Sequence, residues 1–304
     1  MENGRQISRR TTLVEEWKTL MGSLSEETQE TLLGMIRRSL DTVASPDSAF
    51  VSDLKGNLDE VTFLHGMMKD FKTPVSMPAD FPELIKQYSP RPSQVVLPAP
   101  AFEKPSLNLF EALQKRRSYR DFSGEPLTLS QLSQILFYTW GLPRRGSAYY
   151  FNDFPFRSAP SAGGLQPIEV YCVANAINSL APGLYHYQPL AHSLELLNAG
   201  LMRRKIVSLL LKHEWIHPAS VVILLSCVVD RMLWKYGARG YRYMHADAGF
   251  VGQNIYLTAA ALGLGTSAVA GFDEDGLNQL LNLNGRREFV VLAFPIGVPS
   301  NREP

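Results

Sequence analysis

Apolar residues recur at steps of three and four positions in the segment after Tyr243, and this spacing places them on one face of a helix. The helix is expected to extend to about Gly263 and to bury that face. The preceding segment, Lys235–Tyr243, is polar and contains a Lys-Tyr pair and two arginines. It predicts either reactive groups at the entrance to a buried helix or a solvated basic turn. The apolar positions are Met244, Ala248, Val251, Ile255, Ala259 and Leu262.

The most apolar run of the chain, Ala219–Val229, is rich in β-branched residues. It is much shorter than the ~20 residues that a helix needs to cross a bilayer. Because apolar residues follow one another without alternation, the run predicts a central strand that is buried on both faces. Ile255–Phe272 is also apolar, but Gly263 and Gly265 divide it into a helix end and a strand. No transmembrane segment is predicted.

Helix-capping residues and alternating patterns predict the remaining elements of an α+β domain. Asn108 is expected to cap a helix through Leu113, and Thr128 a helix over Leu129–Trp140 that Gly141 ends. Helices and strands do not alternate strictly, which favours a mixed α+β layer over a parallel βαβ fold. Strands are expected at Ile168–Val173, Gly183–Tyr187, Ser193–Leu197, Thr266–Ala270 and Glu288–Ile296, and helices at Leu201–Leu211 and Asp273–Leu281.

The N-terminal third has a different organisation from the rest of the chain. Residues 11–41 carry a helical pattern in two pieces, and another helix is expected over Leu58–Phe71. Eight prolines then fall between Pro74 and Pro105, and each removes a backbone donor and restrains the residue before it. The sequence therefore predicts a helical extension over 1–73, a proline-rich linker over 74–106 and a main domain over 107–304.

Composition and charge are those of an ordinary globular protein, with 45% hydrophobic and 19% charged residues. The formal net charge of +1 offers no global field to attract nucleic acid or an anionic membrane. Two cysteines lie inside apolar runs, Cys172 and Cys227, which favours buried thiols over a disulfide or a metal site. The first ten residues lack the apolar core of a secretory signal, so a cytoplasmic protein is expected.

Three arginines and a serine follow the helix at Asn108, in the stretch Arg116–Phe122. Arginine side chains match phosphate oxygens with two parallel hydrogen bonds, and a hydroxyl between them adds another. The stretch therefore predicts a phosphate clamp. The alternative is a helix C-terminus at which cations complement the helix dipole.

Small residues fill a second stretch, Ser158–Pro167, directly before an expected strand. They would let a flat ligand approach the backbone, where successive N–H groups can meet its oxygens and nitrogens. The alternative is a glycine-rich turn without a ligand. Neither a G-x-G-x-x-G nor a G-x-x-x-x-G-K-[ST] motif is present, so a Rossmann or P-loop site is not supported. A third stretch, Ala270–Asp273, ends a strand where backbone donors are free.

The stretch His213–His217 fits the zinc-binding pattern H-E-x-x-H. However, Pro218 disfavours helical geometry at His217, where the helix of such a site would have to continue. No metal site is therefore predicted. A G-x-S-x-G motif is also missing from the sequence, which weakens a serine hydrolase.

The ordered motifs R-R-S-Y-R-D-F, P-S-A-G-G-L-Q-P, K-Y-G-A-R-G-Y-R-Y and A-G-F-D resemble those of the FMN-dependent nitroreductase superfamily. The resemblance covers about residues 107–298 and implies a mostly antiparallel central sheet flanked by helices. Many plain nitroreductases have asparagine at the position of Gly164 and glutamate at that of Ala270. Both departures resemble the branch that oxidises thiazolines and oxazolines in peptide natural products.

The resemblance also implies roles for single residues. It assigns flavin phosphate and ring-edge binding to Arg116, Arg117, Ser118 and Arg120, and contact with the flavin ring to Ser161, Ala162, Gly163, Gly164 and Gln166. It assigns a backbone contact near flavin N5 to Ala270 and Gly271. Lys235 and Tyr236 match the catalytic pair of the azoline-oxidising branch. Family members are homodimers with FMN at the interface, so a homodimer is expected here too.

The implied reaction converts a thiazoline or oxazoline in a peptide, free or bound to a carrier protein of a nonribosomal synthetase, to the aromatic ring. Tyr236 would act as the base, with its pKa of about 10 lowered by Lys235 and Arg239. Two alternatives stay open. One is an NAD(P)H-dependent reductase of nitroaromatics or quinones, and the other is a non-catalytic protein that docks on a synthetase.

Overall fold

The computed structural model describes residues 25, 60–63, 65, 80–100 and 107–301. Nearly all of them belong to one compact unit, Thr73–Pro304, whose fold is described below. Of the helix expected over Leu58–Phe71, residues 60–63 and 65 are helical. The two helical pieces expected within 11–41 lie outside the described residues, and the three-part division of the chain stays a prediction.

Within the described residues, seven strands form an antiparallel sheet in the order β1-β6-β5-β4-β7-β9-β8. Its centre is β4 (Ile168–Ala174) beside β7 (Val221–Val228), paired from Ile168 with Cys227 to Ala174 with Val221. Nearly every residue of these two strands is buried, which confirms the prediction of a strand covered on both faces. The other strands are β1 (Gln94–Val96), β5 (Gly183–Gln188), β6 (Ser193–Ala199), β8 (Gly265–Thr266) and β9 (Glu288–Gly297).

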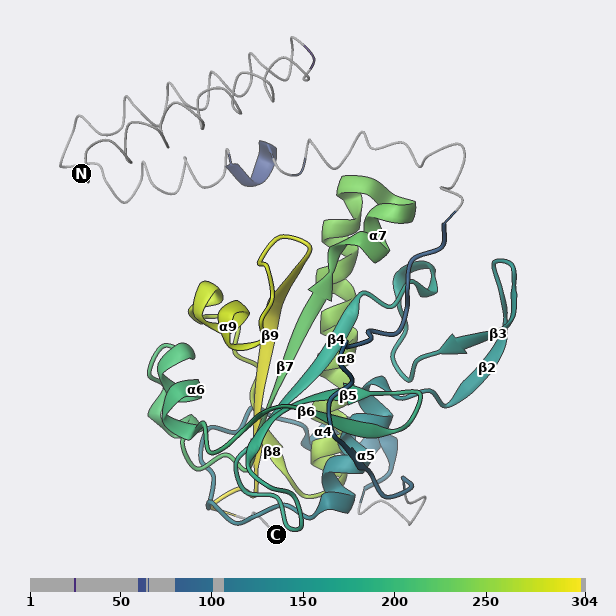
Figure 1. Ribbon diagram of the computed structural model, residues 1–304. Coiled ribbons are helices and arrows are strands. Elements are labelled where there is room, and N and C mark those ends of the chain that lie inside the picture. The colour runs from purple at the N-terminus through teal and green to yellow at the C-terminus, as the bar shows by residue number, and fades with distance from the viewer. Residues whose placement is uncertain (1–24, 26–59, 64, 66–79, 101–106, 302–304) are drawn as a thin grey trace, which may run out of the picture. The chain divides into compact units, whose positions relative to one another are not determined.

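Helices cover both faces of the sheet (Figure 1). On one face, α8 (Gly240–Ala261) and α5 (Leu129–Trp140) pack on the side chains of alternate residues such as Cys172 and Ile223. On the other face, α6 (Arg203–Leu209) and α9 (Glu274–Leu280) pack on the residues in between, such as Val222. The main domain is thus a three-layer α+β structure, as predicted.

Local sequence signals fixed the helix boundaries closely. Asn108 caps α4 (Leu109–Lys115) and Thr128 caps α5, and both caps are reciprocal capping boxes. Helix α5 ends at Gly141, as expected. The apolar stripe predicted for α8 is buried from Met244 to Ala259.

The strand expected over Thr266–Ala270 was predicted too long. Strand β8 covers only Gly265–Thr266. The backbone N–H of Ala268 donates to the Tyr256 hydroxyl at 2.8 Å instead of to a neighbouring strand. Pairing with β9 therefore stops, and it returns only as a single bridge between Val269 and Ala293.

One helix and three strands among the described elements were not predicted. Helix α7 (Val229–Tyr236) follows β7 directly, and β1 lies inside the proline-rich linker, where it pairs with β6. The hairpin of β2 (Arg144–Ala148) and β3 (Phe151–Phe156) projects away from the main sheet (Figure 1). A two-stranded hairpin has no large buried face, so its sequence lacks the clean alternation that reveals a core strand.

Candidate functional site

The loop Ser161–Gln166 turns sharply into β4 because three of its residues have left-handed backbone conformations. Gly163, Gly164 and Gln166 have φ of 59°, 66° and 52°. Glycine adopts this region without steric cost. A Cβ atom at Gly163 would also lie only 2.6 Å from the Tyr236 hydroxyl and 3.0 Å from that of Tyr149. The loop therefore brings bare backbone against two phenols.

The predicted Lys-Tyr pair lies beside this loop, at the C-terminal end of α7. Lys235 Nζ donates to the Tyr149 hydroxyl at 3.3 Å, and the Tyr149 hydroxyl donates to the carbonyl of Gly163. The same amine lies 5.5 Å from the centre of the Tyr236 ring. The structure thus brings the adjacent residues Lys235 and Tyr236 close to Gly163, which lies about seventy positions earlier in the sequence. We call Lys235, Tyr236, Tyr149 and Gly163 the amine–phenol group.

The expectation that cations lower the pKa of Tyr236 is wrong for this chain. Burial raises the pKa of Tyr236 above its ordinary value, and the opposing effect of Lys235 does not overcome it. The other cation named for this role, Arg239, donates from its Nε to the Tyr243 hydroxyl at 2.9 Å. The Tyr243 ring in turn packs edge-on against that of Tyr236, with centroids 4.8 Å apart.

Asp247, a buried carboxylate on α8, anchors the loop through hydrogen bonds. It accepts the backbone N–H of Ala162 at 3.1 and 3.2 Å and also a hydrogen bond from Ser161. Burial raises the pKa of Asp247 to about 6, although these hydrogen bonds oppose the shift. Ser161 Oγ accepts the N–H of Gln166 at 2.8 Å, and the N–H of Gly164 donates to the Ser161 carbonyl. Several donors that were expected to face a ligand are therefore used within the loop.

Gln166 is a buried support of the loop. Its side chain accepts from Arg157 Nε at 2.7 Å and donates to the carbonyl of Pro155, and its own carbonyl accepts from Arg231 at 2.8 Å. Arg231 also pairs with Glu169 at 2.5 Å. The family resemblance assigned Gln166 to the flavin-binding loop, and in the structure its polar side-chain atoms and its carbonyl are paired within the protein.

A chain of buried charges extends from Glu169 across the sheet. His186 lies between the carboxylates of Glu169 and Glu195, at 3.0 and 2.9 Å. Burial alone lowers the pKa of His186, but the two carboxylates outweigh it and the pKa is raised. Both ring nitrogens face carboxylate oxygens, which fits a protonated imidazole that donates twice. No pattern in the sequence marks these partners, because Glu195 and Glu169 lie 9 and 17 positions from His186.

The arginine-rich stretch forms a second group, with Ser118 beside Tyr256 of α8. Ser118 Oγ lies 3.0 Å from the Tyr256 hydroxyl, and the Arg116 guanidinium lies 5.3 Å from the centre of the Tyr256 ring. Arg117 lies 4.7 Å from the Tyr119 ring, and the side chain of Arg120 is exposed. A backbone bridge joins Ser118 to Thr266, close in sequence to Ala270 and Gly271, which are both exposed.

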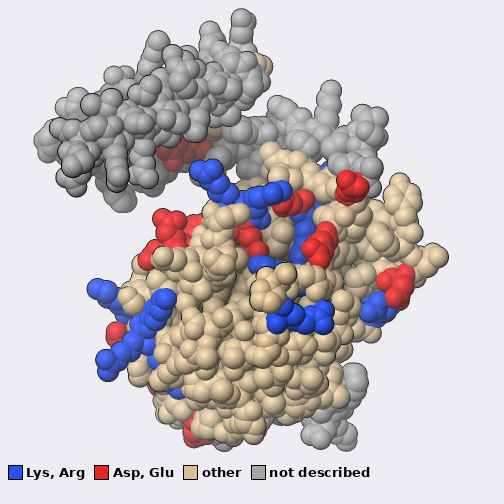
Figure 2. All heavy atoms as spheres, viewed as in Figure 1, with Lys and Arg blue, Asp and Glu red and all other residues tan. Residues whose placement is uncertain are grey.

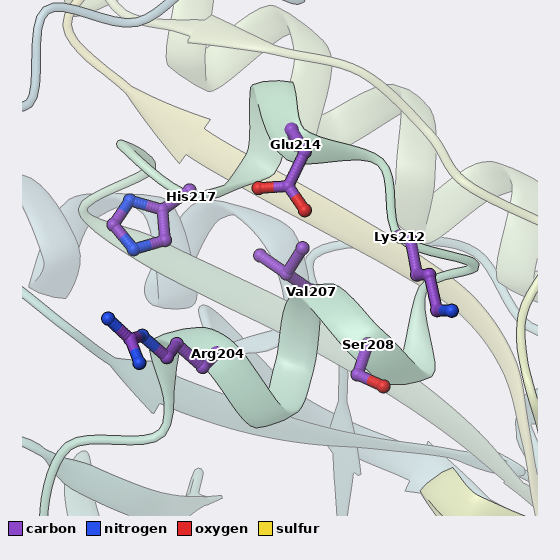
Figure 3. Close-up of a pocket in the computed structure, with 6 residues that line it drawn as sticks. All are labelled: Arg204, Val207, Ser208, Lys212, Glu214 and His217. Carbon is purple, nitrogen blue, oxygen red and sulfur yellow. The ribbon is translucent and has the colours of Figure 1, made fainter.

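Two surface pockets lie on different sides of the sheet. The first, of about 390 Å³, is lined by the loop residues Ser161, Gly164 and Gln166 together with Arg144 of β2. The second, of about 530 Å³, is lined by side chains of α6 and of the turn after it, including Lys212 and the Glu214 and His217 of the H-E-x-x-H pattern (Figure 3). Only the first adjoins the loop that carries the amine–phenol group.

The H-E-x-x-H segment has no zinc-site helix. Glu214–Ile216 form one short 3₁₀ turn, and β7 begins at Val221. Over the residues that the structure describes, no cluster of three His, Cys, Asp or Glu side chains could hold a metal ion.

In the same part of the chain, no helix is long and apolar enough to span a membrane. On the face shown in Figure 2, described side chains of both charges lie interspersed.

Comparison with known proteins gives relatives for the main domain. MJ1384 of Methanocaldococcus jannaschii, a protein named as a nitroreductase, is 34% identical over 191 residues, which are 63% of this chain and 91% of the relative. The trifolitoxin-processing protein TfxB of Rhizobium leguminosarum is 27% identical over 56% of this chain and 47% of its own. The microcin B17-processing protein McbC of Escherichia coli is 26% identical over 53% and 58%. The chain thus spans about half the length of these two processing proteins.

Solved structures share the fold. A nitroreductase structure from Anabaena variabilis matches with a TM-score of 0.59 and 29% identity, covering 74% of this chain and 45% of that one. One from Ralstonia eutropha matches with a TM-score of 0.55 and 28% identity, covering 72% and 98%. Residues 113–298 match the family described as the Nitroreductase family, whose members are flavin-dependent oxidoreductases. Together with the antiparallel sheet and the loop beside Lys235, these matches show that the chain belongs to the nitroreductase family.

Proposed function

We propose that this chain is an FMN-dependent oxidase that converts a thiazoline or oxazoline in a peptide natural product to the aromatic thiazole or oxazole. The observation that carries the proposal is the amine–phenol group, in which Lys235 and Tyr236 lie against the bare backbone of Gly163. A flat ring can approach such a backbone closely, with an acid–base pair beside it. The relation to TfxB and McbC, two proteins named for peptide processing, supports a peptide substrate.

The residues of both groups suit FMN. Arg116, Arg117, Ser118 and Arg120 would hold its phosphate, because guanidinium groups and a hydroxyl match phosphate oxygens. The loop residues Ser161, Ala162, Gly163 and Gly164 would lie along its ring, as would Ala270 and Gly271, while the buried Gln166 would support the loop from within the protein.

When bound, FMN supplies the acceptor for the hydride that leaves the azoline ring. Tyr236 would take the proton from the adjacent ring carbon. Because burial raises the pKa of Tyr236, its hydroxyl must first lose a proton at a cost, and the positive charge of Lys235 lowers that cost. Lys235 is thus assigned the role of making Tyr236 a usable base.

A homodimer is part of the proposal. Helices α4 and α8 pack together and leave apolar side chains exposed, including Phe110 at 80%, Leu109 at 61% and Phe250 at 47%. Large apolar side chains that stay exposed on neighbouring helices are typical of a protein interface. A second copy of this chain would cover it and complete the flavin site. A sedimentation experiment showing only the mass of one chain would contradict this part.

The test of the function is incubation of the yellow protein with a thiazoline-containing peptide, either free or attached to a carrier protein. The intact mass of the peptide is expected to fall by two hydrogens. Steady NADPH consumption with a quinone, and an unchanged peptide mass, would instead select a nitro or quinone reductase. A purified protein that is colourless and cannot be reconstituted with FMN would point to a non-catalytic protein that docks on a synthetase.

Arg116→Ala is expected to lower flavin content strongly. A hydrogen bond to a charged group contributes about 1.5–3 kcal/mol, so losing one such bond weakens binding roughly 10- to 150-fold. The flavin-to-protein absorbance ratio after gel filtration measures the effect. Arg145→Ala is a suitable control, because Arg145 pairs with Asp153 on the exposed hairpin. Equal flavin content in both variants would discredit the phosphate clamp.

A further inference from the structure

Tyr149 lies at the centre of the amine–phenol group, although it comes from a part of the chain that carries none of the family motifs. It stands in the turn between β2 and β3, with a left-handed φ of 54°. Residues other than glycine adopt this conformation at a cost in free energy, and they keep it only where the surroundings enforce it. The contacts of Tyr149 show what enforces it.

The aromatic ring of Tyr149 is packed by three other rings. The centroid of Phe81 is 4.9 Å away, that of Trp234 5.6 Å and that of Phe154 5.8 Å. Phe81 precedes the matched region of the family, so the segment before the main domain takes part in fixing this side chain. The ring therefore has one defined position, and its hydroxyl points to one place.

The Tyr149 hydroxyl has two different partners at that place. It donates its hydrogen to the carbonyl of Gly163 and accepts a hydrogen from Lys235 Nζ at 3.3 Å. Because a hydroxyl has only one hydrogen, the donation to Gly163 leaves the lone pairs of the oxygen to the amine. The Lys235 nitrogen also lies 5.1 Å from the Tyr149 ring centre and 5.5 Å from that of Tyr236, so the cation is held between two phenols.

We propose that Tyr149 is a positioning residue for the azoline oxidation, acting through Lys235. Its hydroxyl ties the amine to the Gly163 carbonyl and so keeps the positive charge beside Tyr236, where that charge makes loss of the phenolic proton less costly. This inference rests on the proposed function of the Lys235–Tyr236 pair. It adds to the site Tyr149 and the supporting ring of Phe81, neither of which belongs to the family motifs.

Tyr149→Phe tests the inference, because it keeps the ring packing and removes only the hydroxyl. Tyr150→Phe is the matched control, since Tyr150 is the next residue of the same turn and is 94% exposed. The first measurement needs no activity: the rate at which an amine-reactive reagent labels Lys235, followed by peptide mass. Labelling is expected to be several-fold faster in Tyr149→Phe and unchanged in Tyr150→Phe. An unchanged labelling rate in Tyr149→Phe would overturn the inference whatever the protein oxidises.

The second measurement is the turnover of a thiazoline peptide. In Tyr149→Phe, kcat is expected to fall about tenfold, as for loss of one hydrogen bond to a charged group. KM and flavin content should be unchanged. Because Tyr149 acts through Lys235, the double variant Tyr149→Phe/Lys235→Ala should be no slower than Lys235→Ala alone. Additive losses would show a separate structural role and overturn the inference. No turnover by the wild-type protein would instead contradict the proposed function, and the labelling result would then decide the placement of Tyr149.

Discussion

Tyr236→Phe and Lys235→Ala are each expected to abolish most azoline oxidation while the protein keeps its flavin. Tyr236 supplies the proposed base, and a positioned base contributes about 10²–10⁴-fold to a rate. Lys235 supplies the charge that assists it. Neither residue belongs to the arginine-rich group at Ser118, so the flavin absorbance of both variants should match that of the wild type. The rate of thiazole formation, followed by peptide mass, measures the loss.

The pH dependence of the wild-type rate offers a second check on Tyr236. Because burial raises the pKa of Tyr236, the fraction of ionised phenol grows through the alkaline range, and kcat/KM should rise with pH until the protein unfolds. Tyr241→Phe is the control, since Tyr241 lies five residues later and is 51% exposed. Full activity in both Tyr236→Phe and Lys235→Ala would remove the chemical basis of the proposed mechanism.

Arg231→Met is expected to destabilise the fold by about 3–5 kcal/mol, as does removal of one partner from a buried ion pair. Arg231 is 3% exposed and pairs with the equally buried Glu169, and it also donates to the carbonyls of Glu83 and Gln166. Methionine fills similar space but leaves Glu169 without its nearest cation. The midpoint of urea unfolding measures the change, which is large against a typical total of 5–15 kcal/mol.

The matched control for that variant is Arg287→Met. Arg287 pairs with Asp230 at 2.7 Å, but both side chains are largely exposed, so its loss should cost at most about 1 kcal/mol. Burial alone raises the pKa of Glu169, but Arg231 and His186 outweigh it and the pKa ends below its ordinary value. The stabilisation from Glu169 is therefore present above about pH 4.5 and is lost as the pH falls. Similar unfolding midpoints for Arg231→Met and Arg287→Met would contradict this account.

The sequence predicted those features that local physics determines. Reciprocal caps at Asn108 and Thr128, the apolar stripe of α8 and the continuous apolar run of β7 all lie within a few neighbouring residues, and each was found where it was expected. The resemblance of their motifs singled out the Lys-Tyr pair and the glycine loop separately, and the structure brings them together. Their meeting in space depends on the fold, which the motifs alone do not contain.

Contacts between residues that are far apart in the sequence could not be predicted from local patterns. Tyr149 meets Lys235 across 86 positions, and Arg231 meets Glu169 across 62. No periodic pattern marks such pairs. Asp247 did leave a signal, since a carboxylate three residues after Met244 falls on the apolar face of the helix and therefore predicts a buried hydrogen-bond partner. The shift of the Tyr236 pKa was predicted in the wrong direction, because the charges next to Tyr236 in the sequence do not show how far its side chain is buried.

The edge strands of the main sheet influence whether this protein aggregates at high concentration. Among the described residues, the outermost strands are β1 and β8, of three and two residues. An edge strand has unpaired backbone N–H and C=O groups to which a strand of another molecule can add. A long exposed edge strand is therefore a common site of aggregation. Beyond the short β8, the outer edge of β9 is partly occupied as well, because the N–H of Val290 donates to Asn278 Oδ1 and that of Ala293 donates to the Val269 carbonyl. The sheet therefore gives little template for the growth of fibres, and any association of copies is left to the helices.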